Sequence, residues 1–200
     1  MSKFDFPESI KSRPVWGQLS AREGAAAHLF VADAEGAEAI IEMEGAAGVM
    51  QNAHIIYIPG REDMSADLKA LDPAQLHVAP TYSSTVQRLR RVLEASHMGL
   101  QVYLAGTEGL MGQAMAECMA AGIPHEAIQT EHRGSTARRM QCVHCKGITE
   151  EVEMDPFTCS HCGLSLFVRD HYSRRLAAYQ GVRVDAEDHG NVPAACAIYP

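Results

Sequence analysis

Short apolar runs alternate with longer amphipathic segments along the first two thirds of this chain. The runs are apolar nearly throughout, whereas apolar positions in the segments between them recur every three or four residues. Strands that alternate with helices predict a doubly wound parallel sheet of the α/β class, covered on both faces. The runs predict strands at residues 28–32, 54–58, 76–79, 100–106 and 127–131, and the segments between them predict helices at 36–46, 61–71, 85–96 and 109–121.

The segment 85–96 has the clearest helical pattern. Leu89 and Leu93 lie on one face, and its arginines lie on the opposite face. Ser83 or Ser84 stands just before the segment, and either hydroxyl is suited to cap the first turn. We therefore expect a surface helix that buries one side against the sheet.

The helix predicted at 109–121 carries one of the six cysteines. Leu110, Ala114 and Cys118 recur every four residues and so share one face. Gly122 follows the last turn, as is common where a helix ends. Cys118 is therefore predicted to be a small buried core residue.

The composition changes at the stretch HRGSTARR, and we place a domain boundary there. Residues 1–135 are assigned to the α/β domain and residues 136–200 to a small second domain. A helix is predicted at about 172–180, because Gly181 supplies a stop signal after it. The residues that follow have no regular pattern.

Four cysteines are the most informative residues of the second domain. Cys142, Cys145, Cys159 and Cys162 form two C-x-x-C pairs separated by thirteen residues. This spacing is typical of a tetrahedral tetrathiolate metal site. Gly163 follows the second pair and allows the positive φ that a tight metal-binding turn favours. The spacing predicts a small four-cysteine ribbon that binds one metal ion.

Two metals suit four thiolates, Zn²⁺ and a mononuclear, rubredoxin-like iron. The short separation of the two pairs favours a zinc ribbon, in which the metal is structural because zinc does not change its oxidation state. Iron is the alternative and would allow electron transfer. His144 and His161 lie inside the cysteine pairs but are expected outside the ligand set, since four sulfurs complete a tetrahedron.

Composition narrows the class of protein. The chain has 200 residues, 46% of them hydrophobic, and a net charge of −8, which argues against a general nucleic-acid surface. It has no apolar run long enough to span a bilayer, and its first residues lack the apolar core of a secretory signal. We therefore expect a cytoplasmic protein whose thiols stay reduced, which favours metal binding over disulfides.

The stretch VYLAGTEGLMGQAMAECMAAGIPHEAIQTE, residues 102–131, resembles the last βαβ unit of ferredoxin–NADP reductase-type domains, and the resemblance extends back to residue 28. It implies a nucleotide-binding fold. The flavin-binding barrel that precedes this domain in the family does not fit into 27 residues, so no flavin is expected in this chain.

This stretch departs from the reductase family where nucleotide binds. The glycine-rich phosphate loop of the family aligns with a run that contains Asp33, Glu35 and Glu38. These carboxylates would repel a pyrophosphate. Ala105 replaces the cysteine that lies beside the nicotinamide in the family. We therefore expect a degenerate reductase-like domain that has lost its nucleotide.

Three stretches of the C-terminal half, CVHC at 142–145, CSHCG at 159–163 and VRDHYSRRLAA at 168–178, resemble the small, cysteine-containing subunit of bacterial dimethylamine monooxygenase. That complex uses O2 and NADPH to convert dimethylamine into methylamine and formaldehyde. Its haem-containing subunit performs the chemistry, and a separate reductase subunit carries flavin and a [2Fe–2S] cluster.

This second resemblance implies a non-haem accessory subunit that serves assembly or electron relay through its four-cysteine metal site. The sequence itself has no haem-binding constellation and no plant-type C-x4-C-x2-C spacing, so no catalytic residue, haem or flavin is expected in this chain. The net charge and the lack of a membrane-spanning run lead us to expect no nucleic-acid or membrane partner. Two alternatives stay open from the residues alone, a stand-alone NAD(P)H-dependent reductase and a zinc-ribbon interaction protein.

Overall fold

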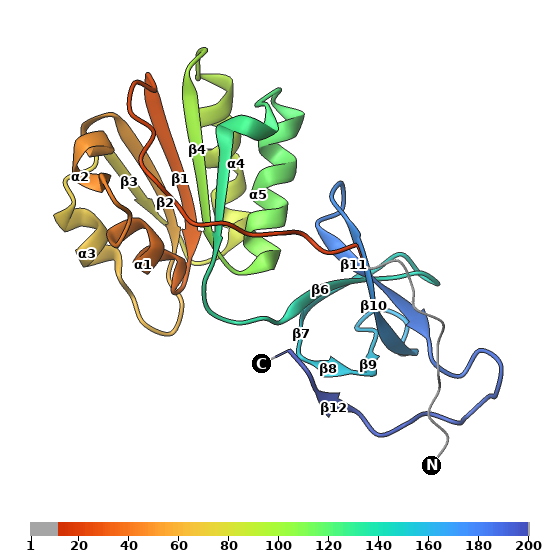
Figure 1. Ribbon diagram of the computed structural model, residues 1–200. Coiled ribbons are helices and arrows are strands. Elements are labelled where there is room, and N and C mark those ends of the chain that lie inside the picture. The colour runs from red at the N-terminus through yellow and green to blue at the C-terminus, as the bar shows by residue number, and fades with distance from the viewer. Residues whose placement is uncertain (1–11, 200) are drawn as a thin grey trace. The chain divides into compact units, whose positions relative to one another are not determined.

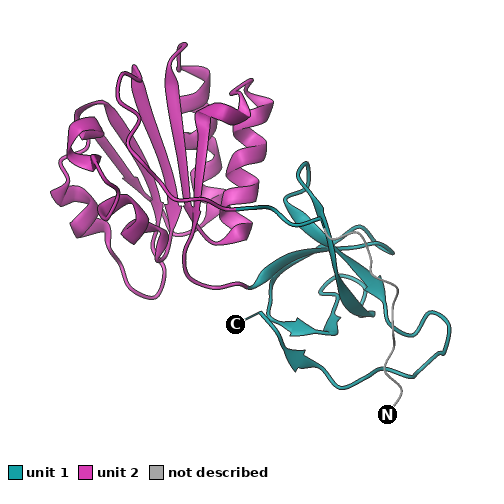
Figure 2. Cartoon of the chain, viewed as in Figure 1, with its two compact units in different colours: residues 1–15, 137–200 teal, residues 16–136 magenta. Residues whose placement is uncertain are grey.

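The computed structural model describes residues 12–199, which form the two units drawn in Figures 1 and 2. One unit comprises residues 16–136, and the other joins residues 12–15 to residues 137–199. The division lies one residue from the predicted boundary, whereas residues 12–15 differ from their predicted assignment to the first domain. The reason is that Ser12 joins the second unit through its backbone, donating to the Asp170 carbonyl over 2.8 Å. The first eleven residues and Pro200 lie outside the described part.

The first unit is built on a five-stranded sheet in the order β3–β2–β1–β4–β5, with every neighbouring pair parallel. The strands are β1 (Ala27–Asp33), β2 (Ala53–Ile58), β3 (Gln75–Val78), β4 (Leu100–Gly106) and β5 (Ile128–His132). The strand order reverses direction between β1 and β4. This arrangement confirms the doubly wound α/β class and the positions of all five predicted strands.

Helices cover both faces of this sheet (Figure 1). On β1, Phe30 and Ala32 belong to the core under α1 and α3, whereas Leu29 and Val31 belong to the core under α4 and α5. Successive strand residues point to opposite faces, so one apolar run serves both cores. The helices are α1 (Gly36–Ile41), α2 (Ala46–Val49), α3 (Ser65–Ala70), α4 (Tyr82–Glu94) and α5 (Glu108–Ala120), with 3₁₀ turns η1 (Met50–Asn52) and η2 (His125–Ala127).

The predicted helix at 36–46 is shorter than expected. α1 ends at Ile41, and Gly45 adopts a left-handed conformation, with φ of 80°, before α2 begins. A left-handed residue interrupts the repeating i to i−4 hydrogen bonds of a helix. The chain therefore turns here instead of extending one helix.

The start of α4 also corrects the prediction. Thr81 is the N-cap, and its hydroxyl accepts a hydrogen bond from the backbone N–H of Ser84. The hydroxyl of Ser84 in turn accepts from the backbone N–H of Thr81, which completes a capping box. Neither predicted serine is the cap, and the helix begins three residues before the segment that its hydrophobic pattern delimits.

An N-terminal segment covers the β5 edge of the sheet. Gly17 donates its N–H to the Thr130 carbonyl over 2.9 Å, and the Leu19 N–H donates to the buried carboxylate of Glu131 over 2.7 Å. An uncovered edge strand presents unpaired backbone groups that favour aggregation. Residues 16–20 therefore complete the sheet at this edge.

The second unit contains a five-stranded sheet in the order β7–β6–β11–β10–β9 and a two-stranded pair of β12 and β8. Its strands are β6 (Arg138–Cys142), β7 (Ile148–Val152), β8 (Met154–Asp155), β9 (Phe157–Thr158), β10 (Ser165–Ser173), β11 (Ala178–Arg183) and β12 (Cys196–Ala197). Its buried core is small, and two of the four clustered cysteines, Cys142 and Cys159, belong to it. This is the ribbon expected around the cysteines.

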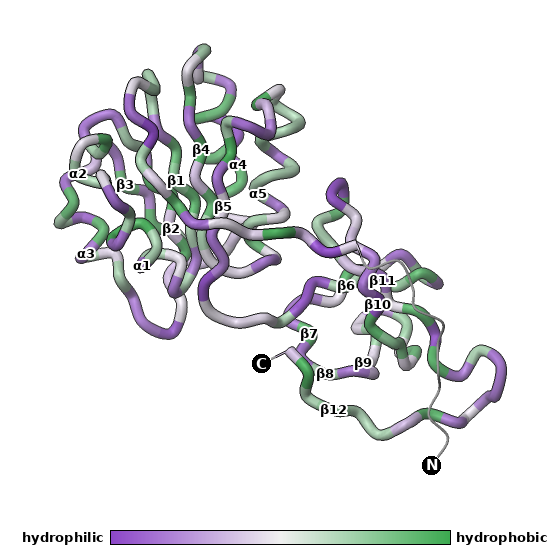
Figure 3. The backbone as a smooth tube through the Cα atoms, viewed as in Figure 1, coloured by the Kyte–Doolittle hydropathy of each residue, from purple (hydrophilic) through white to green (hydrophobic). Residues whose placement is uncertain are grey.

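The helix predicted at about 172–180 is wrong, because this segment forms the hairpin of β10 and β11. Tyr172 and Tyr179 lie opposite each other across the two strands, with their rings edge-to-face and 5.0 Å apart. Ala177, with φ of 50°, turns the chain between them, and the tip of the turn is hydrophilic (Figure 3). Cross-strand pairing of aromatic residues has overridden the local helical preference of the RRLAA sequence.

A buried arginine at the start of β6 contacts residues of β10, of β11 and of the segment after β12. Arg138 bonds the Asp170 carboxylate over 2.9 Å, and its guanidinium lies 4.1 Å from the ring centre of Tyr179 and 4.0 Å from that of Tyr199. Arg13 bonds the same carboxylate over 2.5 Å. A buried charge is tolerated when it is paired and stacked in this way.

Among residues 12–199, no helix is long and apolar enough to cross a membrane.

A close approach of α1 to β4 yields a prediction about stability. A Cβ at Gly36 would lie 2.3 Å from the backbone oxygen of Ala105, whereas a Cβ at Gly48 would meet nothing within 4 Å. Gly36→Ala is expected to destabilise the α/β unit by about 1–3 kcal/mol, because the backbone of β4 must move. Gly48→Ala is the matched control and should change stability by less than about 1 kcal/mol. Urea unfolding followed by circular dichroism checks both, and equal stability of the two variants would contradict the close packing.

Candidate metal centre

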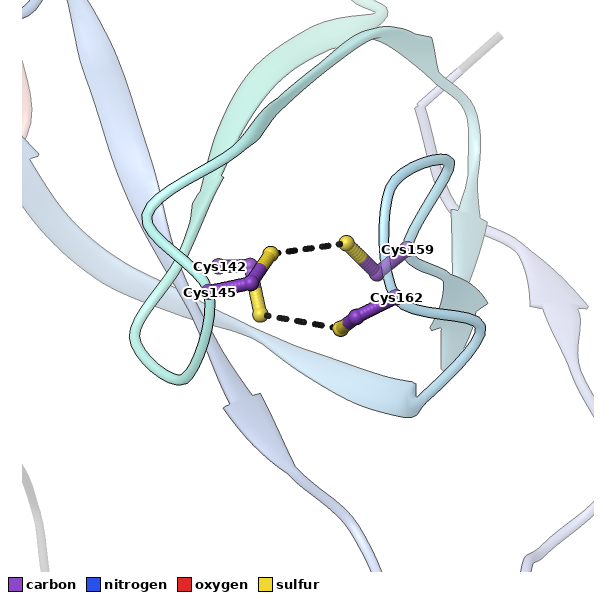
Figure 4. Close-up of side chains that lie close together, drawn as sticks. All are labelled: Cys142, Cys145, Cys159 and Cys162. Atoms are coloured by element: carbon purple, nitrogen blue, oxygen red, sulfur yellow. Dashed lines mark hydrogen bonds between the residues drawn. The ribbon is translucent and has the colours of Figure 1, made fainter.

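The four clustered cysteines meet at one point of the second unit, as Figure 4 shows. Cys142 is the last residue of β6, and Cys145 lies in the turn that leads to β7. Cys159 directly follows β9, and Cys162 lies in the turn that leads to β10. Two separate turns therefore bring their sulfurs together. Their nearest cysteines, Cys145 and Cys159, are 14 positions apart in the sequence.

The distances between the sulfurs fit one metal ion. Sγ of Cys142 lies 3.8 Å from that of Cys162, and Sγ of Cys145 lies 3.7 Å from that of Cys159. All four sulfurs lie within 4.8 Å of one another. A tetrahedral ion with metal–sulfur distances of ~2.3 Å separates its sulfurs by about 3.8 Å. The donor set and its spacing therefore suit a tetrathiolate ion without rearrangement of the turns.

The two turns have the same backbone geometry. The N–H of Lys146 donates to the Cys142 carbonyl over 2.9 Å, and the N–H of Gly163 donates to the Cys159 carbonyl over 3.0 Å. Both donors adopt a positive φ, 65° at Lys146 and 72° at Gly163. Gly163 was recognisable from the sequence, whereas Lys146 was not, because lysine rarely adopts this conformation.

Backbone N–H groups point at the sulfurs in both turns. Gly147 donates to Sγ of Cys145 over 3.4 Å, and the equivalent residue of the second turn, Leu164, donates to Sγ of Cys162. Such bonds stabilise negative charge on a thiolate. The signal in the sequence is the C-x-x-C pair itself, since this short turn places the following N–H groups toward the sulfurs.

The thiols influence one another's ionisation. Burial alone would raise the pKa of Cys159, but N–H groups of Cys162 and His161 and the neighbouring thiols lower it to about 6. The N–H of Leu164 lowers the pKa of Cys162, but burial and its bonds to the other thiols outweigh this and raise it to about 12. One thiolate therefore forms readily, and its charge opposes the next. A bound cation is what allows all four thiols to ionise.

The two histidines inside the cysteine pairs lie outside this cluster. Nε2 of His161 bonds the Ile148 carbonyl over 2.8 Å, and its ring packs against Gly147, where a Cβ would lie 2.4 Å from the ring. His144 is exposed. The cluster that gathers around one point in residues 12–199 consists of the four cysteines alone.

The remaining two cysteines lie elsewhere. Cys118 is fully buried on α5, as predicted, and burial raises the pKa of its thiol to about 12. Cys196 is exposed in β12. Neither belongs to the cluster that fits a metal.

A second place to test is the crevice at the carboxyl ends of β1 and β4, where doubly wound sheets bind nucleotides. Here Asp33 ends β1, and its carboxylate accepts hydrogen bonds from the Thr107 backbone N–H over 2.8 Å and from the Thr107 hydroxyl over 2.6 Å. Thr107 is the N-cap of α5. The N–H and hydroxyl of this N-cap residue are therefore directed at the protein's own carboxylate. Burial raises the pKa of the Asp33 carboxyl, although the two bonds from Thr107 oppose that shift.

The neighbouring charges also do not fit a pyrophosphate. Arg133 bonds Glu131 over 2.7 Å and Glu42 over 2.9 Å, so its charge is already paired. α1 has six residues, with Glu35 as its N-cap and Glu38 in its first turn. Carboxylates repel phosphates at the end of a helix where phosphates usually bind. The residues present do not fit the nucleotide of reductase-type domains.

Comparison with known proteins identifies the family to which this chain belongs. Residues 8–128 match the model of the N-terminal domain of the dimethylamine monooxygenase subunit DmmA-like family, and residues 139–182 match the model of its C-terminal domain. The chain belongs to this DmmA-like family. The C-terminal match contains all four clustered cysteines, and the N-terminal match covers most of the α/β unit.

A curated relative of this DmmA-like chain is the heme-dependent oxidative N-demethylase delta subunit of Ectopseudomonas mendocina (strain ymp). The two are 31% identical over 133 residues, which cover 64% of this chain and 76% of the relative.

Solved structures similar to the DmmA-like chain include phthalate dioxygenase reductase, with a TM-score of 0.45 and 15% identity, covering 70% of this chain and 47% of that one. An intact type IV self-sufficient cytochrome P450 monooxygenase matches with a TM-score of 0.42 and 18% identity over 75% of this chain. The chain spans about half the length of the reductase and 19% of the monooxygenase.

Substitution of one cluster cysteine tests the metal centre of the DmmA-like chain. Cys142→Ser is expected to reduce bound metal from about one ion per chain to a small fraction and to lower the thermal stability of the ribbon, because metal binding contributes directly to folding. Cys196→Ser, at an exposed cysteine outside the cluster, is the control and should keep the full metal content. Metal analysis by mass spectrometry with a thermal melt checks both. Full metal content in Cys142→Ser would contradict the site.

Proposed function

We propose that this chain is a non-haem accessory subunit of an oxidative N-demethylase complex that acts on dimethylamine. The observation that carries the proposal is the match of both parts of the chain, residues 8–128 and 139–182, to one family of dimethylamine monooxygenase subunits. The 31% identity to a delta subunit supports the same assignment. In this proposal a haem-containing subunit performs the chemistry, and a flavin and [2Fe–2S] reductase supplies electrons.

The metal centre supports an accessory role in place of a catalytic one. Four cysteine sulfurs fill a tetrahedron, so a bound ion has no open position for a substrate or water. A catalytic zinc keeps such a position. The site therefore suits a structural ion or an ion that transfers electrons.

We propose zinc as the ion and iron as the alternative. The ribbon has a small apolar core that includes Cys142 and Cys159 among its buried members. A unit with so little apolar core gains much of its stability from a metal that ties its turns together. If the ion is iron, exposed Cys145 is the ligand through which a partner's redox centre would come nearest to it.

The metal itself gives the first test. We expect the purified chain to be colourless and to contain about one zinc per chain. Metal analysis and a visible spectrum of the same freshly prepared sample give both quantities. Red protein with one iron, bleached by dithionite, would contradict the zinc assignment and would make the four cysteines a step in electron transfer.

Assembly tests the subunit role. The tagged chain, expressed in its native host during growth on dimethylamine, is expected to co-elute in size-exclusion chromatography with a haem absorbance band and flavin fluorescence. The same experiment with Cys142→Ser, compared with the wild-type chain, tests whether the intact ribbon is needed for the association. Elution of the wild-type chain alone, at the mass of a free subunit, would contradict the proposal.

A further inference from the structure

A hollow lies at the opposite edge of the α/β sheet from the nucleotide crevice, near the amino ends of β2 and β3. It has a volume of about 450 Å³. Its polar lining includes His54 of β2, Gln75 of β3, Arg88 and Arg91 of α4, and His97 of the loop after α4. We call this hollow the amino-edge pocket.

The charge of the amino-edge pocket is opposite to that of the unit around it. None of the residues that line the pocket is an aspartate or a glutamate. The α/β unit, residues 16–136, nevertheless contains 15 acidic residues and 7 lysines and arginines. A pair of cationic side chains in an acidic unit is a local reversal of sign, which favours anions at this edge.

Helix geometry brings the two arginines together. Arg88 and Arg91 are three residues apart on α4, so they lie on the same face, and Val92 and Ala95 continue this stripe into the pocket. Like charges at this spacing destabilise a helix, because the two groups are neighbours on its surface. A bound anion would remove that repulsion.

The guanidinium of Arg88 is oriented without being neutralised. Its Nη2 donates to the side-chain oxygen of Gln75 over 2.6 Å, and its Nε donates to Nε2 of His54 over 3.4 Å. Burial, together with the positive charge of Arg88 and the neighbouring His77, lowers the pKa of His54 to about 4. His54 is therefore a neutral acceptor at pH 7. Gln75 and His54 fix the direction of the Arg88 guanidinium. Neither side chain carries a negative charge, so neither neutralises the arginine.

Arg90, between these two arginines in the chain, is different. It forms two hydrogen bonds to the Glu117 carboxylate, each 2.7 Å long, on the other side of α4. Its charge is neutralised within the protein. No such carboxylate pair is found for Arg88 or Arg91 among residues 12–199. The helix therefore carries one paired arginine and two that are available to an anion.

We propose that the amino-edge pocket binds a small organic phosphate. Two guanidinium groups suit the double negative charge and the several oxygens of a phosphate monoester. The volume is in the range of small-molecule sites, which span ~300–1,000 Å³. Val92 and the exposed side chain of Met98 supply an apolar wall for the organic part of the ligand.

The test uses inorganic pyrophosphate as the probe and the complete 200-residue chain at low ionic strength. Two-dimensional NMR titration is expected to show saturable shifts of α4 and the loop after it. Arg88→Gln combined with Arg91→Gln should weaken binding at least tenfold, whereas Arg90→Gln, which removes one positive charge from the same helix, should change it less than twofold. Equal binding by the three proteins, or no saturation up to about 20 mM pyrophosphate in the wild type, would overturn the proposal.

Two further measurements keep the test decisive. Arg91 is exposed, so Arg91→Gln alone should keep the fold of the unit, which circular dichroism checks, and it should still weaken binding. Citrate serves as the carboxylate probe. Weaker binding of citrate than of pyrophosphate is expected, and tighter binding of citrate would overturn the assignment to phosphates.

Discussion

The close approach of four cysteine sulfurs is the constraint on which the second unit depends. These sulfurs lie within 4.8 Å of one another, and the contacts between the thiols lower the pKa of Cys159 while they raise the pKa of Cys162. The turns that lead to β7 and β10 are brought together here, and their four sulfurs form a donor set that suits one metal ion. The surrounding apolar core is small, and Cys142 and Cys159 are among its buried members, so the meeting of the two turns is part of how this unit packs.

The α/β unit has the crevice at which doubly wound sheets usually bind a nucleotide, but its side chains there are paired with one another. Here Asp33 accepts both hydrogen bonds that Thr107 offers, and Arg133 is paired with Glu131 and Glu42. The N-cap donors at this edge and the charge of Arg133 are therefore satisfied within the protein. The sheet therefore keeps its architecture through its two apolar cores, while its usual binding edge is closed by its own carboxylates.

Segments from both ends of the described chain are tied to the ribbon by one charged group. Arg138 connects Asp170 of β10 with the rings of Tyr179 and Tyr199, and Asp170 also pairs with Arg13. These residues are separated by up to 186 positions in the sequence. A single buried cation thus organises three segments, because removing one partner from a buried charge is costly. This explains why residues 12–15 belong with the ribbon.

The sequence by itself determined the elements that rest on local patterns. Apolar runs located β1 to β5, and resemblance in both halves indicated the family. The spacing of two C-x-x-C pairs located the cluster of Cys142, Cys145, Cys159 and Cys162. These signals are local, since strand periodicity and a C-x-x-C turn each depend on residues a few positions apart.

Only the tertiary structure decided the features that depend on distant partners. Residues 172–180 have helical composition but form strands, because Tyr172 meets Tyr179 across a hairpin and β11 pairs with β6. Asp33 looks like a repulsive charge in the sequence and is in fact a hydrogen-bond acceptor for Thr107, 74 residues away. The orientation of the Arg88 guanidinium likewise depends on Gln75 and His54 lying beside it. Local propensity is worth about tenths of a kcal/mol per residue, so long-range pairing and burial decide such cases.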